Sequence, residues 1–278
     1  MRFINPKIYF AFQKIFGSEQ NKDILISFLN AILYNGNPTI ADLEIINPYL
    51  APRIRGIKDT YLDVKAKITG NKTVIIEMQV LNLEGFEKRI LYNAAKAYSI
   101  QLQTGEDYTD LDPVIALTIT DFEMFPKLDQ VISRFRLKET DYLIDYLVYD
   151  IELVFVELPK FTKEVDRLET LSDRWIYFLK SANQLQEVPE TMETVTEIKK
   201  AFQVANQATL SPEELEDLEK RAIYIHDQRN AIKKAVNQAV KQTAIKIAQQ
   251  LLDVLDEKTI SQKTGLTVEE IQKLKNES

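Results

Sequence analysis

The stretch that decides the fold runs from Tyr61 to Val80 and reads YLDVKAKI, TGNK and TVIIEMQV in succession. Its first and last parts alternate side chains of β-strand type between two faces. Gly70 and Asn71 lie between these parts, and residues of this kind favour a tight turn. The stretch therefore predicts an antiparallel β-hairpin.

The length of the turn decides which side chains of this hairpin face one another. With a three-residue turn at positions 69–71, Asp63 lies directly opposite Glu77, and their Cβ atoms are about 5 Å apart. Gln79 shares the face of Glu77, because side chains alternate along a strand. A two-residue turn would shift the register by one and place the two acids on opposite faces. The first register brings two carboxylates and an amide together.

Two carboxylates at this distance suggest a metal site. They repel each other, and burying both as charged groups is costly unless a cation joins them. Such oxygen ligands suit Mg²⁺, which keeps several waters and often takes one or two carboxylates plus a phosphate. The ion can lower the pKa of a bound water and stabilise charge on a phosphodiester. The spacing also fits an ordinary hairpin whose acids lie on a solvated face.

The Asp, the hairpin and the Ile-Glu-x-Gln run at 76–79 resemble the Asp…(Asp/Glu)-x-Lys core of the PD-(D/E)XK nuclease superfamily. The chain looks most like the Rpn branch, the recombination-promoting nucleases and transposases. The resemblance covers roughly the first 180 residues, and the order of its motifs is more specific than any one of them. Besides the hairpin, the similar runs are FQKIFG (12–17), FLNAIL (28–33), LDVKA (62–66), FEKR (86–89), ELPKF (157–161) and WIYFL (175–179).

This resemblance implies an α/β fold, with a mixed-sheet PD-(D/E)XK nuclease core flanked by helices. It implies that Asp63 and Glu77 hold Mg²⁺ and that Gln79 stands where the superfamily has its Lys. A neutral amide can orient water but supplies no charge, so Lys65, on the Asp63 face, is a candidate to replace the missing charge in part.

Composition limits the other classes of function. The 278 residues include no cysteine and one histidine, His226, which excludes disulfides, zinc fingers, thiol nucleophiles and histidine-pair nuclease chemistry. No run approaches the ~20 apolar residues of a membrane helix. A reducing cytoplasm fits the lack of cysteine. The net charge of −7 argues mildly against a protein that simply coats nucleic acid, but not against a nuclease whose metal neutralises its acids.

The residues after the hairpin, 84–104, predict a helix that ends at Gly105. An apolar stripe at three- and four-residue steps is expected to face the core, and it comprises Leu91, Ala94, Ala95, Tyr98 and Leu102. Arg89, Asn93 and Lys96 fall on the roughly opposite face. Arg89 either lies on a solvated face or reaches a phosphate near the acids, since a guanidinium fits phosphate geometry.

The rest of the chain divides by composition. Strands are expected at 114–119 and 147–158, and their alternation with helices favours an α/β or α+β core. Residues 1–180 are therefore expected to form the nuclease-like domain. From 181 to 278 no convincing strand occurs, which predicts an all-helical C-terminal region.

This C-terminal region contains one unusually long predicted helix, from Ser211 to about Asp256. Between positions 221 and 246 it holds six basic residues against one acid, so Arg229, Lys233 and Lys234 are candidates for DNA-backbone contacts, with a solvated face as the alternative. The helix also offers a surface for self-association. Two capped segments after it, at 259–262 and 267–270, resemble a helix-turn-helix or form a plain helical hairpin.

Together these features predict a Mg²⁺-dependent DNA endonuclease, which the family resemblance links to recombination or mobile elements. The alternative is a catalytically worn nuclease fold that binds DNA or assembles complexes. Its basis is the departure of Tyr9, Gln13 and Gln79 from the family pattern, since Tyr9 and Gln13 hold the outer positions of an opening Asp-x-x-Phe-Lys motif.

Overall fold

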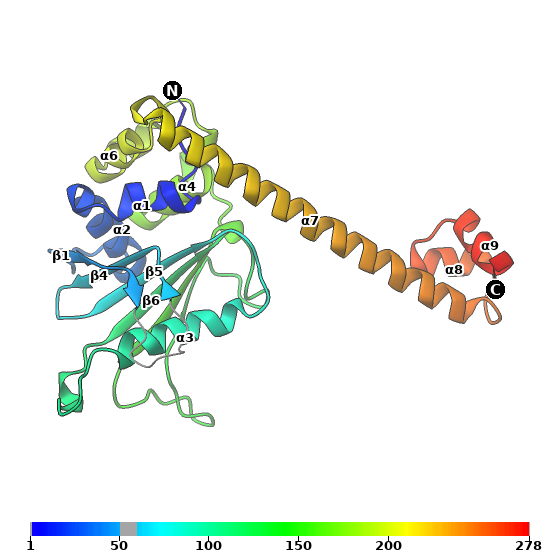
Figure 1. The fold of residues 1–278 in the computed structure, drawn as a ribbon, viewed down its shortest axis with the longest axis horizontal. Coiled ribbons are helices and arrows are strands. Elements are labelled where there is room, and N and C mark those ends of the chain that lie inside the picture. Colours follow the sequence, from blue (N-terminus) through cyan, green and yellow to red (C-terminus); the bar gives the residue numbers. More distant parts are fainter. Residues whose placement is uncertain (1, 51–59, 278) are drawn as a thin grey trace. The chain divides into compact units, whose positions relative to one another are not determined.

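The computed structural model describes residues 2–50 and 60–277. They fall into two compact units, Met1–Ala222 and Ile223–Ser278. The first unit contains the strands together with helices α1 to α6, and the second is helical (Figure 1). The predicted α/β core with a helical C-terminal region is confirmed.

The first unit is built on a six-stranded mixed sheet in the order β1-β4-β5-β6-β8-β7. Its strands are β1 (Leu43–Ile46), β4 (Val64–Ile68), β5 (Thr73–Gln79), β6 (Val114–Thr120), β7 (Ile132–Phe135) and β8 (Ile151–Glu157). The pairs β5–β6 and β6–β8 are parallel, and the other three are antiparallel. A separate two-stranded ribbon pairs β2 (Tyr49–Leu50) with β3 (Thr60–Tyr61).

The predicted hairpin is formed by β4 and β5, and its register is the one that favours a metal site. Val64 pairs with Ile76, and Ile68 donates its backbone N–H to the carbonyl oxygen of Lys72 at 2.8 Å. Gly70 and Asn71 have φ angles of 78° and 59°, so the three-residue turn uses the left-handed conformations that Gly and Asn tolerate best. In this register Asp63, one residue before β4, lies opposite Glu77.

Helices cover both faces of this sheet. Helix α3 (Phe86–Ser99) lies on one face, while α1 (Tyr9–Phe16), α2 (Lys22–Tyr34), α4 (Leu171–Ser181) and α6 (Thr196–Val204) lie on the other (Figure 1). A short helix, α5 (Glu190–Glu193), precedes α6. The strands expected at 114–119 and 147–158 correspond to β6 and β8, but β8 begins at Ile151 because residues 142–149 form an exposed connection.

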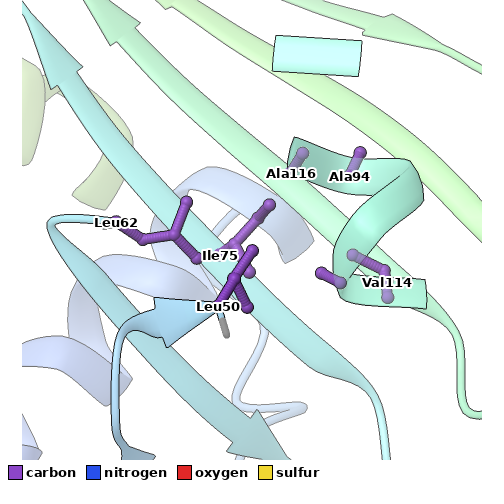
Figure 2. Close-up of a cluster of buried hydrophobic side chains, with 7 residues drawn as sticks. Leu50, Leu62, Ile75, Ala94, Val114 and Ala116 are labelled. Atoms are coloured by element: carbon purple, nitrogen blue, oxygen red, sulfur yellow. The ribbon is translucent and has the colours of Figure 1, made fainter. Parts of the chain in front are cut away.

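The face under α3 is closed by small side chains. Ile75 of β5 and Ala116 of β6 pack against Ala94 of α3 in a cluster that Leu50 and Leu62 extend (Figure 2). The alanines let the helix approach the sheet closely, and burial of the aliphatic groups stabilises the contact by about 25 cal/mol per Å² of apolar surface.

The predicted core stripe of α3 is correct at Ala94 and Tyr98, which lie in or against the buried cluster, and wrong at Leu91 and Ala95. Leu91 is 57% exposed and Ala95 is exposed, whereas Ile90, Ala94 and Ala97 face the core. The buried face also includes Asn93, which donates a hydrogen bond to a carboxylate on the sheet. The helix is therefore rotated toward its polar stripe, and it ends at Ser99 rather than at 104.

The opposite face is held by a chain of aromatic rings. Phe16 of α1 contacts Phe28 of α2 with ring centroids 4.9 Å apart, and Trp175 of α4 lies 5.8 Å from both. Phe178 continues the chain to Phe202 of α6 at 4.8 Å. Such edge-to-face and tilted contacts are favourable beyond their buried area. These ring contacts join α6 to helices α1, α2 and α4.

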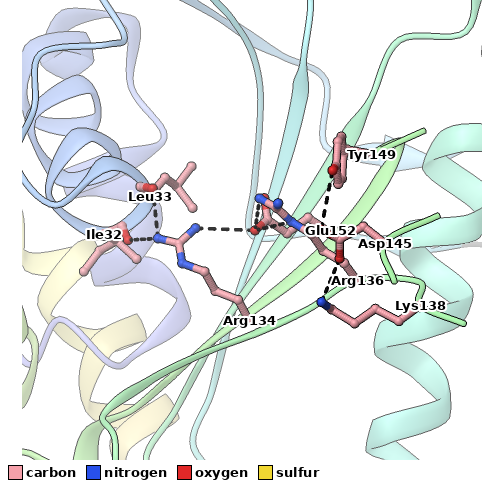
Figure 3. Close-up of polar contacts among 8 residues, drawn as sticks. All are labelled: Ile32, Leu33, Arg134, Arg136, Lys138, Asp145, Tyr149 and Glu152. Atoms are coloured by element: carbon pink, nitrogen blue, oxygen red, sulfur yellow. Dashed lines mark hydrogen bonds and ion pairs between the residues drawn. The ribbon is translucent and has the colours of Figure 1, made fainter. Parts of the chain in front are cut away.

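Charged groups tie the distal edge of the sheet to α2. Arg134 of β7 donates to the carbonyl oxygens of Ile32 and Leu33 at 2.7 and 2.9 Å, where α2 ends and its carbonyls lack helical partners (Figure 3). Glu152 of β8 accepts from both Arg134 and Arg136. Arg134 and Arg136 therefore have structural roles at this edge of the sheet.

The run ELPKF begins at Glu157, the last residue of β8, and holds the loop that follows β6. Glu157 is fully buried, accepts from the backbone N–H groups of Met124 and Phe125, and pairs with Lys160 at 2.7 Å. Lys160 also donates to the carbonyl oxygens of Phe125 and Leu128. A buried ion pair with its remaining polar positions satisfied fixes the loop after β6, which is a structural role.

The second unit is a small helical assembly. Helix α7 (Pro212–Leu251) begins in the first unit, and its C-terminal end packs with α8 (Glu257–Thr264) and α9 (Val268–Glu277). Ala248, Ile260, Leu266 and Ile271 form its core. Gly265, with φ of 73°, ends α8 in the left-handed conformation. Among the described residues, none of the helices has the length and hydrophobicity that a membrane-spanning segment requires.

Candidate active site

A cavity of about 430 Å³ lies where β5 faces the side of α3. Asp63, Glu77 and Gln79 all line it, together with Arg89 and Asn93 of α3. The remaining lining residues are Tyr9, Thr60, Tyr61, Met78 and Tyr92. The three polar residues of the hairpin therefore share one concave space with two from the helix.

Asp63 is held by contacts from both sides. Its backbone N–H donates to the carbonyl oxygen of Ile76 at 3.2 Å, which continues the hairpin ladder, and its Oδ2 accepts from the backbone N–H of Met78 at 2.5 Å. Gln13 of α1 donates its side-chain amide to the carbonyl oxygen of Asp63 at 3.2 Å. These contacts fix the direction of the carboxylate.

Glu77 is embedded between strand and helix. Its side chain is 13% exposed, its Oε1 accepts a short hydrogen bond from Asn93 Nδ2, and its Oε2 lies 3.5 Å from Arg89 Nη2. Both partners come from one face of α3, four residues apart, which is the spacing that aligns side chains on a helix. The rotation of α3 toward its polar stripe therefore serves this carboxylate.

The Gln79 amide is engaged at both ends. Its Nε2 donates to the carbonyl oxygen of Leu81 at 2.7 Å, and its Oε1 accepts from Arg89 Nη2 at 2.8 Å. Because both ends have partners, the side chain is fixed and holds the guanidinium at the cavity wall. The structure thus places a full positive charge beside the Gln79 amide.

The electrostatics of the two acids follow from burial. Burial raises the pKa of Asp63 to about 7, and the charge of Glu77 adds to this, while the Met78 N–H and Arg89 oppose it. Burial also raises the pKa of Glu77 against the lowering effects of Arg89 and Asn93. Two carboxyl groups that resist ionisation together form a site that a cation would stabilise.

The donor set fits a hard divalent cation. The Asp63 and Glu77 carboxylates supply oxygen ligands, and Asn93 Oδ1 is a buried oxygen without a hydrogen-bond partner within the described chain. Oxygen ligands in this number suit Mg²⁺, which retains waters. No group of three or more His, Asp or Glu side chains with metal-binding proximity occurs in residues 2–50 and 60–277.

Lys65 is placed apart from this group. It lines a neighbouring cavity of about 370 Å³ with Gln13, Lys14 and Asp63, so Asp63 borders both cavities. Burial lowers the pKa of Lys65, and the charges that shift the pKa of Asp63 are those of Glu77 and Arg89. Lys65 therefore does not join the acids, Gln79 and Arg89 around the first cavity.

The basic residues of α7 also lie outside the cavity lining. Arg229, Lys233 and Lys234 belong to the second unit, where their side chains are exposed.

The sequence patterns did not assign four residues to this cavity, namely Asn93, Tyr9, Tyr61 and Tyr92. Asn93 could have been found, because it lies four residues after Arg89 on the same helix face. Tyr9 occupies the outer position of the opening family motif and lines the cavity, where burial and the charge of Asp63 raise its pKa. Tyr61 and Tyr92 gave no signal in the sequence, because their position depends on the packing of separate elements.

A comparison with protein families covers the part of the chain that forms this cavity. The family described as PD-(D/E)XK nuclease family transposase matches residues 6–235, which include every residue that lines the cavity. No curated protein and no solved structure matches the chain. Nucleases of this type generally use divalent metals, as the paired acids would require. Because the match spans well over half of its length and confirms the resemblance in its motifs, the chain belongs to the PD-(D/E)XK nuclease family of transposases.

Proposed function

We propose that this protein is a Mg²⁺-dependent DNA endonuclease that hydrolyses phosphodiester bonds in recombination or the movement of mobile elements. The observation that carries the proposal is the convergence of Asp63 and Glu77 in one cavity, in the register set by the three-residue turn. Membership of a nuclease family supports the reaction class, and the oxygen-only donor set supports the choice of metal.

Each residue has a chemical task in this proposal. Asp63 and Glu77 would hold the ion, whose presence lowers the pKa of a bound water and stabilises charge on the phosphodiester. Arg89, held by Gln79, binds a phosphate oxygen and offsets the negative charge that develops there. Asn93 fixes the orientation of the Glu77 carboxylate, because its amide donates to Oε1.

The charge that Lys would supply in this superfamily is therefore assigned to Arg89. Gln79 contributes by positioning the guanidinium, and the geometry favours Arg89 over Lys65, which lines the adjacent cavity. Lys65 retains a supporting part as a positive charge near the substrate path.

Paired substitutions test the assignment of the acids. Asp63→Asn and Glu77→Gln keep the size of each side chain but remove a charged ligand, so each is expected to lower Mg²⁺-dependent plasmid cleavage by about 100-fold or more. Glu44→Gln, which changes an exposed acid on β1, is the matched control and should cleave like the wild type. Near-normal cleavage by either cavity variant would contradict the proposal.

The second candidate function is DNA binding or assembly on a nuclease fold that no longer cuts. The observations that favour it are Tyr9 and Gln13 in the outer positions of the opening motif and the neutral Gln79. This candidate predicts that purified protein retains DNA without cleaving it in Mg²⁺ or Mn²⁺.

The helical unit is proposed to add DNA contacts and self-association. Arg229, Lys233 and Lys234 supply positive charge for backbone phosphates. Ile232, Val236 and Val240 are exposed at four-residue steps on α7, the spacing of a helix face that pairs with a second helix. Light scattering on the full chain measures the state of assembly, and Val236→Glu should shift a dimer toward monomer.

A further inference from the structure

Three tyrosines stand at the cavity that holds the two acids. Tyr9 and Tyr92 are each 39% exposed and Tyr61 is 72% exposed, and all three line the same space as Asp63 and Glu77. They come from α1, β3 and α3, which are separate in sequence. Large aromatic groups that remain this exposed gain little from the folding of the chain itself.

Each of the three rings is held in place by a neighbour. Tyr61 stacks on Tyr49 with ring centroids 4.7 Å apart and planes 29° apart. The Arg221 guanidinium lies 5.3 Å from the Tyr9 ring, and the Lys96 ammonium lies 5.8 Å from the Tyr92 ring. Ordered rings with cations beside them lose little conformational freedom when a flat ligand stacks on them.

The chemistry around the cavity matches a nucleotide strand. Arg89 lines both this cavity and the neighbouring one that Leu83, Phe86 and Lys88 border, and Tyr92 is also common to the two. Positive charge that follows a backbone, together with aromatic side chains that stack on bases, is the combination used by proteins that bind single-stranded nucleic acid.

A base pair within a duplex cannot use these rings. Its faces are covered by the adjacent pairs, so a base must leave the stack before an aromatic side chain can contact its face. The acids are also recessed, since Glu77 is largely buried and is bonded to Asn93. A flexible unpaired strand can bring a phosphate to recessed acids in a cavity lined by these tyrosines more readily than a rigid duplex.

We propose that this site takes an unpaired DNA strand, with Tyr61 and Tyr92 as stacking platforms for the bases on either side of the phosphate that reaches the acids. The inference rests on the proposed nuclease function and names its substrate class. Single strands, forks and bulges present such bases, whereas a blunt duplex does not.

Cleavage of matched substrates tests the substrate class. The full chain in Mg²⁺ is given one labelled sequence as a single strand, as a blunt duplex and as a duplex with an unpaired fork. The single strand and the fork are expected to give kcat/KM values at least about tenfold above that of the duplex. Equal values for all three would overturn the inference.

A binding measurement tests the stacking itself and does not depend on cleavage. A single strand that carries 2-aminopurine is titrated into the Glu77→Gln protein, and stacking on a ring should quench its fluorescence. Tyr61→Ala and Tyr92→Ala in this background should each raise the Kd by about five- to 100-fold and reduce the quenching. Tyr61→Phe keeps the ring and should bind normally. Tyr108→Ala, which removes an exposed tyrosine outside the cavity, is the control.

The two measurements separate this inference from the nuclease proposal. Single-strand binding with ring-dependent quenching, but no cleavage of any DNA, would support the inference and contradict the nuclease function. Cleavage with unchanged affinity and quenching in both alanine variants would support the nuclease function and overturn the inference. Melting temperatures like that of the parent protein confirm that each variant is folded.

Discussion

Arg89 connects the helix above the sheet with two different acceptors on β5. It donates to the neutral Gln79 oxygen at 2.8 Å and lies 3.5 Å from the charged Glu77 oxygen. The shorter contact is to the amide, so the guanidinium keeps donors available for a further anion. An amide at position 79 is therefore compatible with a positively charged site.

Replacing Arg89 tests whether its guanidinium supplies the positive charge while Gln79 only positions it. Arg89→Met is expected to lower kcat/KM for DNA cleavage by about 100-fold, because the charge beside the phosphate is removed. Adding Gln79→Lys to that variant returns a cation to the strand and should recover at least about tenfold. Lys127→Met, which changes an exposed lysine that lines neither cavity, should alter kcat/KM less than about threefold. If the double variant had no higher kcat/KM than Arg89→Met, the assignment of the positive charge to Arg89 would be contradicted.

Asp63 links the site to the pH dependence of stability in metal-free protein. Its pKa is raised to about 7 in the folded state from an ordinary value near 4, so the folded protein holds the proton more tightly than the unfolded chain. The free energy of unfolding therefore falls as pH rises from about 4 to about 7, and the cost is complete above pH 7.

Asp63→Asn removes this titration. In EDTA at pH 8 the variant should be more stable than the wild type by up to about 4 kcal/mol, and the difference should shrink toward pH 4. Urea denaturation at the two pH values measures both differences. Mg²⁺ should stabilise the wild type more than the variant, because only the wild type keeps both acids. A variant less stable than the wild type at pH 8 would be inconsistent with an acid whose pKa is raised by burial.

At the scale of elements, α3 shows where sequence patterns stop being informative. The hairpin could be predicted because alternation and turn residues are local properties. They left two registers open, and the structure has the one that places Asp63 opposite Glu77. The orientation of α3 could not, since apolar periodicity favoured Leu91 while the structure buries Asn93. The hydrogen bond from Asn93 to Glu77 joins residues from different elements, so the apolar pattern of the helix alone could not indicate it.

Helix α7 gives an element-scale prediction about DNA binding. Changing Arg229, Lys233 and Lys234 together to Gln should flatten the log–log salt dependence of DNA affinity by up to about 3, close to one unit for each phosphate that the variant no longer neutralises. Fluorescence anisotropy over a range of salt concentrations measures this slope.

A second triple variant on α8 and α9 provides the matched change in charge. Lys258, Lys263 and Lys273 are exposed bases on these helices, and their change to Gln should leave the slope unaltered. The first turn of α9 carries Glu269 and Glu270, and Glu270 is bound to Lys241 at 2.7 Å. If the second triple flattened the slope and the first did not, the DNA contacts would lie on the helical hairpin.

At the scale of the whole molecule, all residues of the cavity belong to the unit Met1–Ala222. Helix α6 and the start of α7 are packed into this unit. Phe202 of α6 contacts Phe3 and Phe178, and Glu214 of α7 pairs with Lys14 of α1 at 2.5 Å. The change in composition at residue 180 stays a prediction about where an independently folding domain ends.

Two truncated chains test that prediction. A fragment of residues 1–222 should fold and cut DNA in Mg²⁺, with weaker binding at physiological salt. A fragment of residues 1–180 lacks the buried Ile198 and Phe202, and losing such core groups costs about 2–5 kcal/mol each. It should therefore melt well below the longer fragment. Equal melting temperatures would place the end of the folding unit at 180.

The three-residue turn between β4 and β5 has a consequence for how this family can vary in length. Deleting Asn71 would move β4 by half a period against β5, and would turn Lys65 and Lys67 toward the side where Val64 and Ala66 are now buried. The change would also carry Asp63 away from Glu77. Insertion or deletion of two residues would instead keep each side chain on its present face of the sheet. Viable homologues should therefore differ here by even numbers of residues, so odd-length indels at this turn would be a sequence marker of lost activity.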